Sequence, residues 1–178
     1  SRVVLKNVLL NKTRIEAFKV LEKMGARIEF KQIHNDFERV GEICVQSSHL
    51  RAVSVSENIS WLIDEAPALA IAFACAEGVS RLTNAKELRV KESDRISAVV
   101  QNLQRCGIKA KELDDGFEIQ GGVAKRAKIQ SFGDHRIAMS FAILGLKCGM
   151  DIDECECINT SFPNFLSLLE NLGAVVER

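Results

Sequence analysis

A repeated plan of helix, glycine and strand constrains the fold of this chain more than any other feature. The segments FKVLEKMGARIEF (18–30), VQNLQRCGIKAKEL (100–113) and LSLLENLGAVVER (166–178) each read as an amphipathic helix end, a glycine and a strand-like run. A glycine at this point predicts a left-handed residue that ends the helix, and these glycines are Gly25, Gly107 and Gly173. Each repeat is one supersecondary unit that buries its apolar face by stacking on its neighbours.

A second element repeats between these segments. DEAPALAIAFACAEGVSRLTN (64–84) and GDHRIAMSFAILGLKCGMDIDEC (133–155) both begin with an acid, continue as an almost wholly apolar run and reach a glycine before a strand-like stretch. A helix that is apolar on all sides is a buried helix. The predicted unit is therefore buried helix, strand, loop, amphipathic helix, strand and strand. We expect the buried helices to pack centrally with the sheets outside them.

The first unit lacks its buried helix. The sequence opens with SRVVLKN, which resembles VSRLTNA (79–85), the stretch that follows the buried helix of the next unit. A unit without that helix exposes the surface that the helix would cover. We therefore expect the natural protein to continue before Ser1, with residues 1–178 forming one α/β domain at its C-terminal side. The alternative is that the first unit has degenerated.

Composition excludes several classes of protein. The formal net charge is zero, so the chain has no excess of positive charge that would indicate binding to nucleic acid or to a membrane surface. The longest apolar run, residues 66–76, is too short to cross a bilayer. The six cysteines form no Cys-x-x-Cys pair, which favours a reduced, cytoplasmic protein. Cys155 and Cys157 could bind a metal, but no histidine or second cysteine pair lies nearby in sequence, and we expect no metal.

Charged residues stand at the predicted starts of the two apolar helices. Asp64 opens the first, and Gly133-Asp134-His135-Arg136 opens the second. Helix N-termini suit anionic ligands, and an arginine can hold a carboxylate or phosphate with two hydrogen bonds. His135 titrates near neutrality and could donate to a phosphate oxygen. The alternative is a capped helix start, with Asp134 as the cap and the two bases solvated.

The segment ELRVKESDRI (87–96) is the densest charge cluster. Lys91 and Arg95 are four residues apart, so on a helix they would share a face. Glu92 could be tuned by Lys91 and act as a general acid or base beside an anionic substrate. We expect Asp94 to orient Arg95. A surface network of i to i+4 ion pairs would have the same composition, but the clusters fall at equivalent ends of repeated units and could converge.

Four motifs together resemble the family of 3-phosphoshikimate 1-carboxyvinyltransferases, also called EPSP synthases. They are LIDEAP (62–67), LRVKESDR (88–95), GDHRIAM (133–139) and TSFPNF (160–165), in the family's order and over nearly the whole chain. The resemblance implies an inverse α/β barrel domain of βαβαββ units packed pseudo-symmetrically. It also implies that this chain is most of the C-terminal domain, entered partway through its first unit.

The resemblance implies transfer of the enolpyruvyl group of phosphoenolpyruvate to the 5-hydroxyl of shikimate 3-phosphate, with release of phosphate and without cofactor or metal. Glu92 matches the carboxyl that protonates the methylene carbon, Asp64 the acid at the shikimate hydroxyls and Lys91 the lysine near the reacting hydroxyl. Arg95 and Arg136 match the arginines that hold phosphoenolpyruvate. The remaining matches are a phosphate-side histidine, His135, and a shikimate-side residue, Glu87.

Two departures from the family's pattern bear on function. Thr160 stands where some members have a phosphate-binding lysine, and Lys147 cannot be assumed to replace it. The family binds the shikimate phosphate mainly through an N-terminal domain, so we expect this chain alone to turn over no substrate. Two alternatives are an enolpyruvyl transferase acting on a UDP-sugar and an anion-binding module without catalysis. The first lacks the paired RVKESDR and GDHR motifs, and the second has no use for Asp64 and Glu92.

Overall fold

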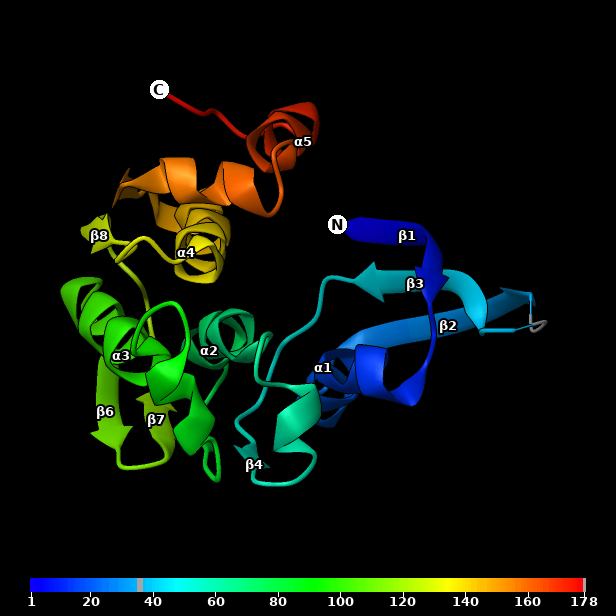
Figure 1. The fold of residues 1–178 in the computed structure, drawn as a ribbon, viewed down its shortest axis with the longest axis horizontal. Coiled ribbons are helices and arrows are strands. Elements are labelled where there is room, and N and C mark those ends of the chain that lie inside the picture. The colour runs from blue at the N-terminus through cyan, green and yellow to red at the C-terminus, as the bar shows by residue number, and fades with distance from the viewer. Residues whose placement is uncertain (35–36, 178) are drawn as a thin grey trace.

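A computed structural model describes residues 1–34 and 37–177 of the chain. Three successive units follow one another, coloured blue to cyan, cyan to green and yellow to red in Figure 1. Within the described residues, no helix has both the length and the apolar character needed to cross a membrane. The predicted mixed α/β class is confirmed.

The first unit consists of β1 (Arg2–Leu9), α1 (Lys12–Lys23), β2 (Arg27–His34) and β3 (Val40–Gln46). Its sheet has the order β1-β3-β2, and both pairings are antiparallel. Helix α1 packs on the sheet beside β2, where the rings of Phe18 and Phe30 meet edge to face with centroids 6.4 Å apart. Strand β1 lies at the edge of this sheet.

The second unit is the most complete. It runs β4 (Ser54–Val55), the 3-10 helix η1 (Ile59–Trp61), α2 (Ala66–Ala74), β5 (Val79–Leu82), the 3-10 helix η2 (Lys86–Val90), α3 (Arg95–Arg105), β6 (Lys109–Leu113) and β7 (Gly116–Gln120). The sheet order is β4-β5-β7-β6, with β4 parallel to β5 and the other pairs antiparallel. From α2 to β7 the order is the helix, strand, helix, strand, strand that the repeats predicted, and with β4 it is the βαβαββ unit that the family resemblance implied.

The third unit contains β8 (Lys128–Gln130), α4 (His135–Cys148), β9 (Asp151–Asp153), the 3-10 helix η3 (Cys155–Thr160) and α5 (Phe165–Asn171). Strands β8 and β9 are parallel, as β4 and β5 are. The strand predicted after Gly173 is wrong for the described residues, because 174–177 pair with no strand. Gly25, Gly107 and Gly173 all have positive φ, which confirms them as left-handed helix ends.

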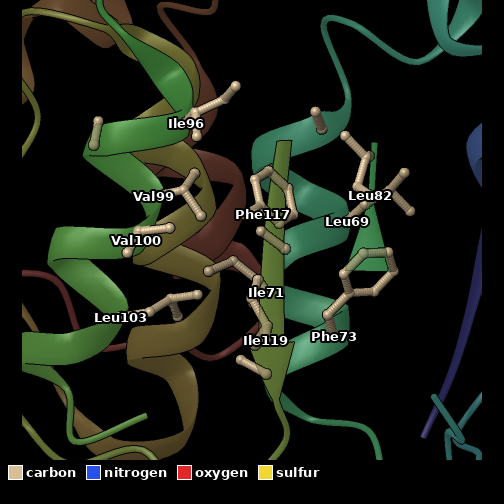
Figure 2. Close-up of a cluster of buried hydrophobic side chains, with 14 of the residues drawn as sticks. Leu69, Ile71, Phe73, Leu82, Ile96, Val99, Val100, Leu103, Phe117 and Ile119 are labelled. Atoms are coloured by element: carbon tan, nitrogen blue, oxygen red, sulfur yellow. The ribbon is translucent and has the colours of Figure 1, made fainter. Parts of the chain in front are cut away.

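The core forms where α2, α3 and the sheet of the second unit meet. Figure 2 shows Ile96, Val99 and Leu103 of α3 directed toward α2 and toward Phe117 and Ile119 of β7. These five side chains are fully buried. The amphipathic pattern of α3 and the uniformly apolar pattern of α2 therefore predicted their positions correctly.

Helix α4 is less buried than its sequence predicted. It packs against α2, and Ile137, Ala138 and Phe141 are fully buried on that side. However, Ile143 is 44% exposed and Leu146 is 56% exposed. The prediction of a helix buried all round is wrong here, because only the side of α4 that packs on neighbouring elements such as α2 and η3 is buried.

Candidate active site

The starts of α2, α3 and α4 come together around one arginine. Arg95, the first residue of α3, is 1% exposed. Its Nε donates to Asp134 Oδ2 at 2.8 Å, its Nη1 to Asp64 Oδ1 at 3.1 Å and its Nη2 to Glu92 Oε2 at 2.7 Å. One guanidinium therefore connects carboxylates from three segments that are distant in sequence, which confirms that the charge clusters converge.

Asp134 is the inner partner of Arg95 and is fully buried. It also accepts from Ser93 Oγ at 3.0 Å and, as the N-cap of α4, from the Arg136 amide at 2.9 Å. Burial alone would raise the pKa of Asp134, but the hydrogen bonds from Arg95 and Arg136 outweigh it, and the pKa lies below its ordinary value. Asp134 is thus a helix cap and at the same time the ionised counter-charge of Arg95.

The outer partners of Arg95 are open to solvent. The side chains of Asp64 and Glu92 are 51% and 49% exposed, whereas that of Arg95 is 1% exposed. Burial opposes the charge of Arg95, but hydrogen bonding to Asp134 and the charge of Glu92 raise its pKa above the ordinary value. Arg95 therefore stays a cation whose Nη1 and Nη2 are hydrogen-bonded to two half-exposed carboxylates. An anionic group could replace them on the same fork.

Arg136 lies next to Asp64. Its Nη1 donates to the Asp64 carbonyl at 2.7 Å, and its Nη2 lies 3.5 Å from Asp64 Oδ2. Its side chain is 31% exposed, so the guanidinium is partly available. His135 is the first residue of α4 and is half-buried beside Asp134. Two arginines thus approach Asp64 from α3 and α4.

Glu87 and Lys91 line an adjacent cavity of about 280 Å³ together with Asp64. Lys91 Nζ donates to Glu87 Oε1 at 2.6 Å. The cavity is also lined by Thr13, Arg14 and Trp61, which the sequence analysis did not identify. Thr13 and Arg14 are in the first turn of α1, just as Arg95 is in the first turn of α3, so the repeat alignment was the signal that could have found them.

Two expectations about the charged segment are wrong. Lys91 and Arg95 share no helix face, because η2 ends at Val90 and α3 begins only at Arg95. Asp94 does not orient Arg95 by a direct hydrogen bond: its Oδ1 accepts from the Ser97 amide at 3.0 Å and its Oδ2 from Arg89 Nη1 at 2.8 Å. Aspartate is a favoured N-cap, and this capping decided both outcomes. Glu92 accepts a hydrogen bond from Arg95, and Lys91 pairs with Glu87.

The loop that carries Thr160 offers no cation in place of the family's lysine. Thr160 ends η3, and its Oγ1 donates to the Cys157 carbonyl at 2.7 Å. Lys147 belongs to the last turn of α4, whereas His135 begins that helix. A rise of 1.5 Å per residue separates them by about 18 Å, so Lys147 cannot take over at this end of α4.

Metal ligation has no support among residues 1–34 and 37–177, where no three His, Cys, Asp or Glu side chains are grouped to hold an ion. All six cysteines are free thiols, including Cys155 and Cys157. Burial raises the pKa of Cys106 to about 11, so this thiol stays protonated at neutral pH. The charged side chains that the structure brings together at the site are carboxylates, arginines, Lys91 and His135.

The fold is shared with solved structures of other proteins. An enolpyruvyl transferase from Streptomyces tendae, NikO, superposes with a TM-score of 0.74 at 16% identity, covering 99% of this chain and 40% of that one. At this identity the likeness concerns the fold alone. An EPSP synthase structure from Acinetobacter baumannii superposes with a TM-score of 0.94 at 37% identity, covering 99% of this chain and 42% of that one.

Comparison of the sequence with protein families and relatives identifies the family of this chain. The family described as EPSP synthase (3-phosphoshikimate 1-carboxyvinyltransferase) matches residues 1–169, and the chain belongs to this family. Relatives with that name are 65% identical in Campylobacter jejuni subsp. doylei and 66% identical in Campylobacter curvus, each match covering 99% of this chain. The chain spans 42% of the length of these relatives.

Proposed function

We propose that this chain is the C-terminal, phosphoenolpyruvate-side domain of a 3-phosphoshikimate 1-carboxyvinyltransferase of the cytoplasm, and that it works with an N-terminal domain. The observation that carries the proposal is the group of Asp64, Glu92 and Asp134 around buried Arg95, at the positions that match the family's motifs. Residues 1–178 would supply the acids and arginines of the reaction.

The substrates are phosphoenolpyruvate and shikimate 3-phosphate. The 5-hydroxyl oxygen of shikimate 3-phosphate bonds to C2 of phosphoenolpyruvate, while C3 gains a proton and becomes a methyl group. Phosphate then leaves C2 as C3 loses a proton, which restores the double bond. Glu92 is the carboxyl that exchanges the proton at C3, and Asp64 takes the hydroxyl proton with Lys91 beside it.

Arg95 and Arg136 hold phosphoenolpyruvate, since planar guanidinium groups bind carboxylate or phosphate through two hydrogen bonds. Arg95 reaches the substrate through Nη1 and Nη2, which Asp64 and Glu92 occupy in this structure. When the substrate displaces them, both carboxyls lose a cationic partner next to the reacting atoms. His135 and Glu87 contact the phosphate and the shikimate side, respectively.

A chimera tests the proposal. Residues 1–178 replace the matching 42% of the Campylobacter jejuni relative, so that the full length is present. With both substrates, the chimera should release phosphate, and the 178-residue chain alone should release none. A properly folded chimera without phosphate release would contradict the proposed activity, and turnover by the chain alone would contradict the need for a second domain.

Two substitutions in the chimera test the assigned acids. Asp64→Asn and Glu92→Gln should each lower kcat by about 10²-fold or more, the usual contribution of a positioned general acid or base. Glu65→Gln is the matched control, because Glu65 is adjacent to Asp64 and lies 4.0 Å from Arg136. If Asp64→Asn and Glu92→Gln retain the kcat of the control, these two residues do not transfer the protons.

A further inference from the structure

Arg89 precedes the turn of residues 91–93, which carries Lys91 and Glu92 and is called the reacting turn below. None of the roles proposed above is assigned to Arg89. It is the fourth residue of η2, two residues before Lys91 and three before Glu92. Its side chain is 25% exposed, and its guanidinium donates hydrogen bonds to the β6–β7 hairpin. The motif analysis treated it only as part of the charge cluster.

The guanidinium of Arg89 binds three consecutive residues of that hairpin. Nε donates to the Asp114 carbonyl at 2.8 Å, Nη2 to the Leu113 carbonyl at 2.6 Å and Nη1 to Glu112 Oε1 at 2.7 Å. Two of these acceptors are backbone carbonyls at the tip of a hairpin with regular register, so their positions are fixed by the sheet. A lysine has one nitrogen and cannot reproduce this fork.

The same guanidinium also reaches the start of α3. Nη1 donates to Asp94 Oδ2 at 2.8 Å, while Asp94 Oδ1 caps the helix at the Ser97 amide. Arg89 therefore joins the hairpin to the residue that immediately precedes Arg95. A shift of Asp94 would move the first turn of α3 and the arginine at its start.

The hairpin also binds the residues that begin this segment, Asn84 and Ala85. Asp115 Oδ2 accepts from the Asn84 amide at 2.7 Å, and the Asp115 carbonyl accepts from the Ala85 amide at 2.8 Å. Asn84 has a φ of 62°, a left-handed conformation that the bond to Asp115 helps to hold. Residues 84–94 are thus attached to one hairpin directly at their beginning and middle, and at their end through Arg89.

The reacting turn needs this support because it has little structure of its own. Helix η2 spans five residues, and residues 91–93 form bends. A 3-10 segment of this length is marginal without tertiary contacts. Glu92 is attached to the protein by a single described hydrogen bond, to Arg95, which the substrate itself would take. Once that bond is given up, the position of Glu92 depends on its backbone.

We propose that Arg89 is a positioning residue, which clamps the turn carrying Lys91 and Glu92 to the β6–β7 hairpin and keeps Glu92 in place when substrate takes Arg95. The inference rests on the proposed function for its kinetic assay. Arg89 touches no reacting atom, so its effect falls on the chemical step more than on substrate binding. A misplacement of about 1 Å can cost about 10²-fold in rate.

The kinetic test uses the chimera with Arg89→Lys and Arg89→Met. Both should lower kcat by at least about tenfold, because Glu92 is no longer aligned with the substrate in the transition state. KM for each substrate should change by less than about threefold, because the residues that bind the substrates are unchanged. Arg81→Lys and Arg81→Met are the matched controls, since Arg81 pairs with Glu118 on the other face of the same sheet and does not contact the turn. A loss of kcat no greater than that of the controls, or a rise in KM alone, would overturn the proposal.

Two further measurements keep the test independent of folding and of the proposed reaction. Asp94→Asn keeps a good helix cap but weakens the contact to Arg89, so it should lower kcat even if the Arg89 variants fail to fold. In the 178-residue chain, Arg89→Lys should speed amide hydrogen exchange in residues 86–94 relative to Arg81→Lys. Unchanged exchange in residues 86–94 would overturn the clamp, whether or not the chimera is active. Faster exchange in the 178-residue chain together with an inactive chimera would support the clamp and contradict only the proposed reaction.

Discussion

The first and second units share one plan but differ in what covers it. Leu5 of β1 and Leu82 of β5 each lie two residues before a left-handed asparagine, Asn7 or Asn84. The structure therefore places these two leucines at equivalent positions. Leu82 is 0% exposed, whereas Leu5 is 37% exposed. The same strand is core in one unit and surface in the other.

The difference comes from the neighbours of the strand. In the second unit, β5 lies between β4 and β7, and α2 packs on its sheet. In the first unit, β1 is an edge strand, and the neighbouring residues Val3 and Leu9 are 45% and 38% exposed. The comparison teaches that the repeat specifies the conformation of a unit, while burial depends on the elements that the unit meets.

The largest predicted effect separates the two leucines. Leu82→Ala should lower the free energy of unfolding by about 4 kcal/mol, because it leaves a cavity in a closed core. Leu5→Ala should cost about 1 kcal/mol, since the side chain already contacts water. Urea unfolding of the 178-residue chain measures both. Equal losses would mean that the two strands are equally buried in solution and would break the comparison.

A smaller effect concerns the ion pair that joins the second and third units. Asp134→Asn should lower the free energy of unfolding by about 3 kcal/mol at pH 7, because it removes the buried counter-charge of Arg95. The folded-state pKa of Asp134 is lowered, so its contribution is present above the ordinary value of about 3.9 and is lost as pH falls below that value.

Urea titrations between pH 3 and pH 7 check this prediction. The wild-type chain should lose stability relative to Asp134→Asn as the pH falls below about 4, so the two curves should approach each other. The first unit provides the internal control, because Glu22 is paired with Lys19 on the surface. Glu22→Gln should change stability by less than about 0.5 kcal/mol at either pH. A constant gap between wild type and Asp134→Asn would contradict the buried pair.

The smallest effect should be the same in both units. Gly25 and Gly107 have φ of 95° and 77°, and an added Cβ would meet no heavy atom closer than 3.5 Å at either position. Gly25→Ala and Gly107→Ala should therefore each cost about 1 kcal/mol, which is the conformational penalty alone. Calorimetry of the two variants measures it. A much larger loss at Gly107 would show that the helix end, like the strand, depends on the surrounding unit.

Sequence periodicity predicted the features that are local to one segment. The helix-ending glycines, the burial of α2 and the apolar face of α3 follow from residue type and spacing, and the structure confirms them. The convergence of Asp64, Glu92 and Arg95 was also predicted, because the repeat placed their segments at equivalent ends. Their catalytic roles stay a prediction.

Features that depend on the choice of partner could not be predicted in the same way. Asp94 could orient Arg95 or cap a helix, and only the position of the first helical residue decides between them. The bonds of Arg89 to Leu113 and Asp114 join residues more than twenty positions apart and leave no periodic signal. The exposure of Ile143 depends on which elements pack against α4, and helix periodicity does not specify them.

The attachment of Arg95 to three separate segments has a consequence for how activity and folding are linked. Asp64, Glu92 and Asp134 come from before α2, before α3 and the cap of α4, so no unit contains the whole group. Opening any one of these helix starts exposes a charged group and breaks up the cluster to which we assign proton transfer. The site is therefore assembled cooperatively, and in the chimera the loss of the proposed activity in denaturant should coincide with unfolding of the second and third units, whereas β1 can fray earlier.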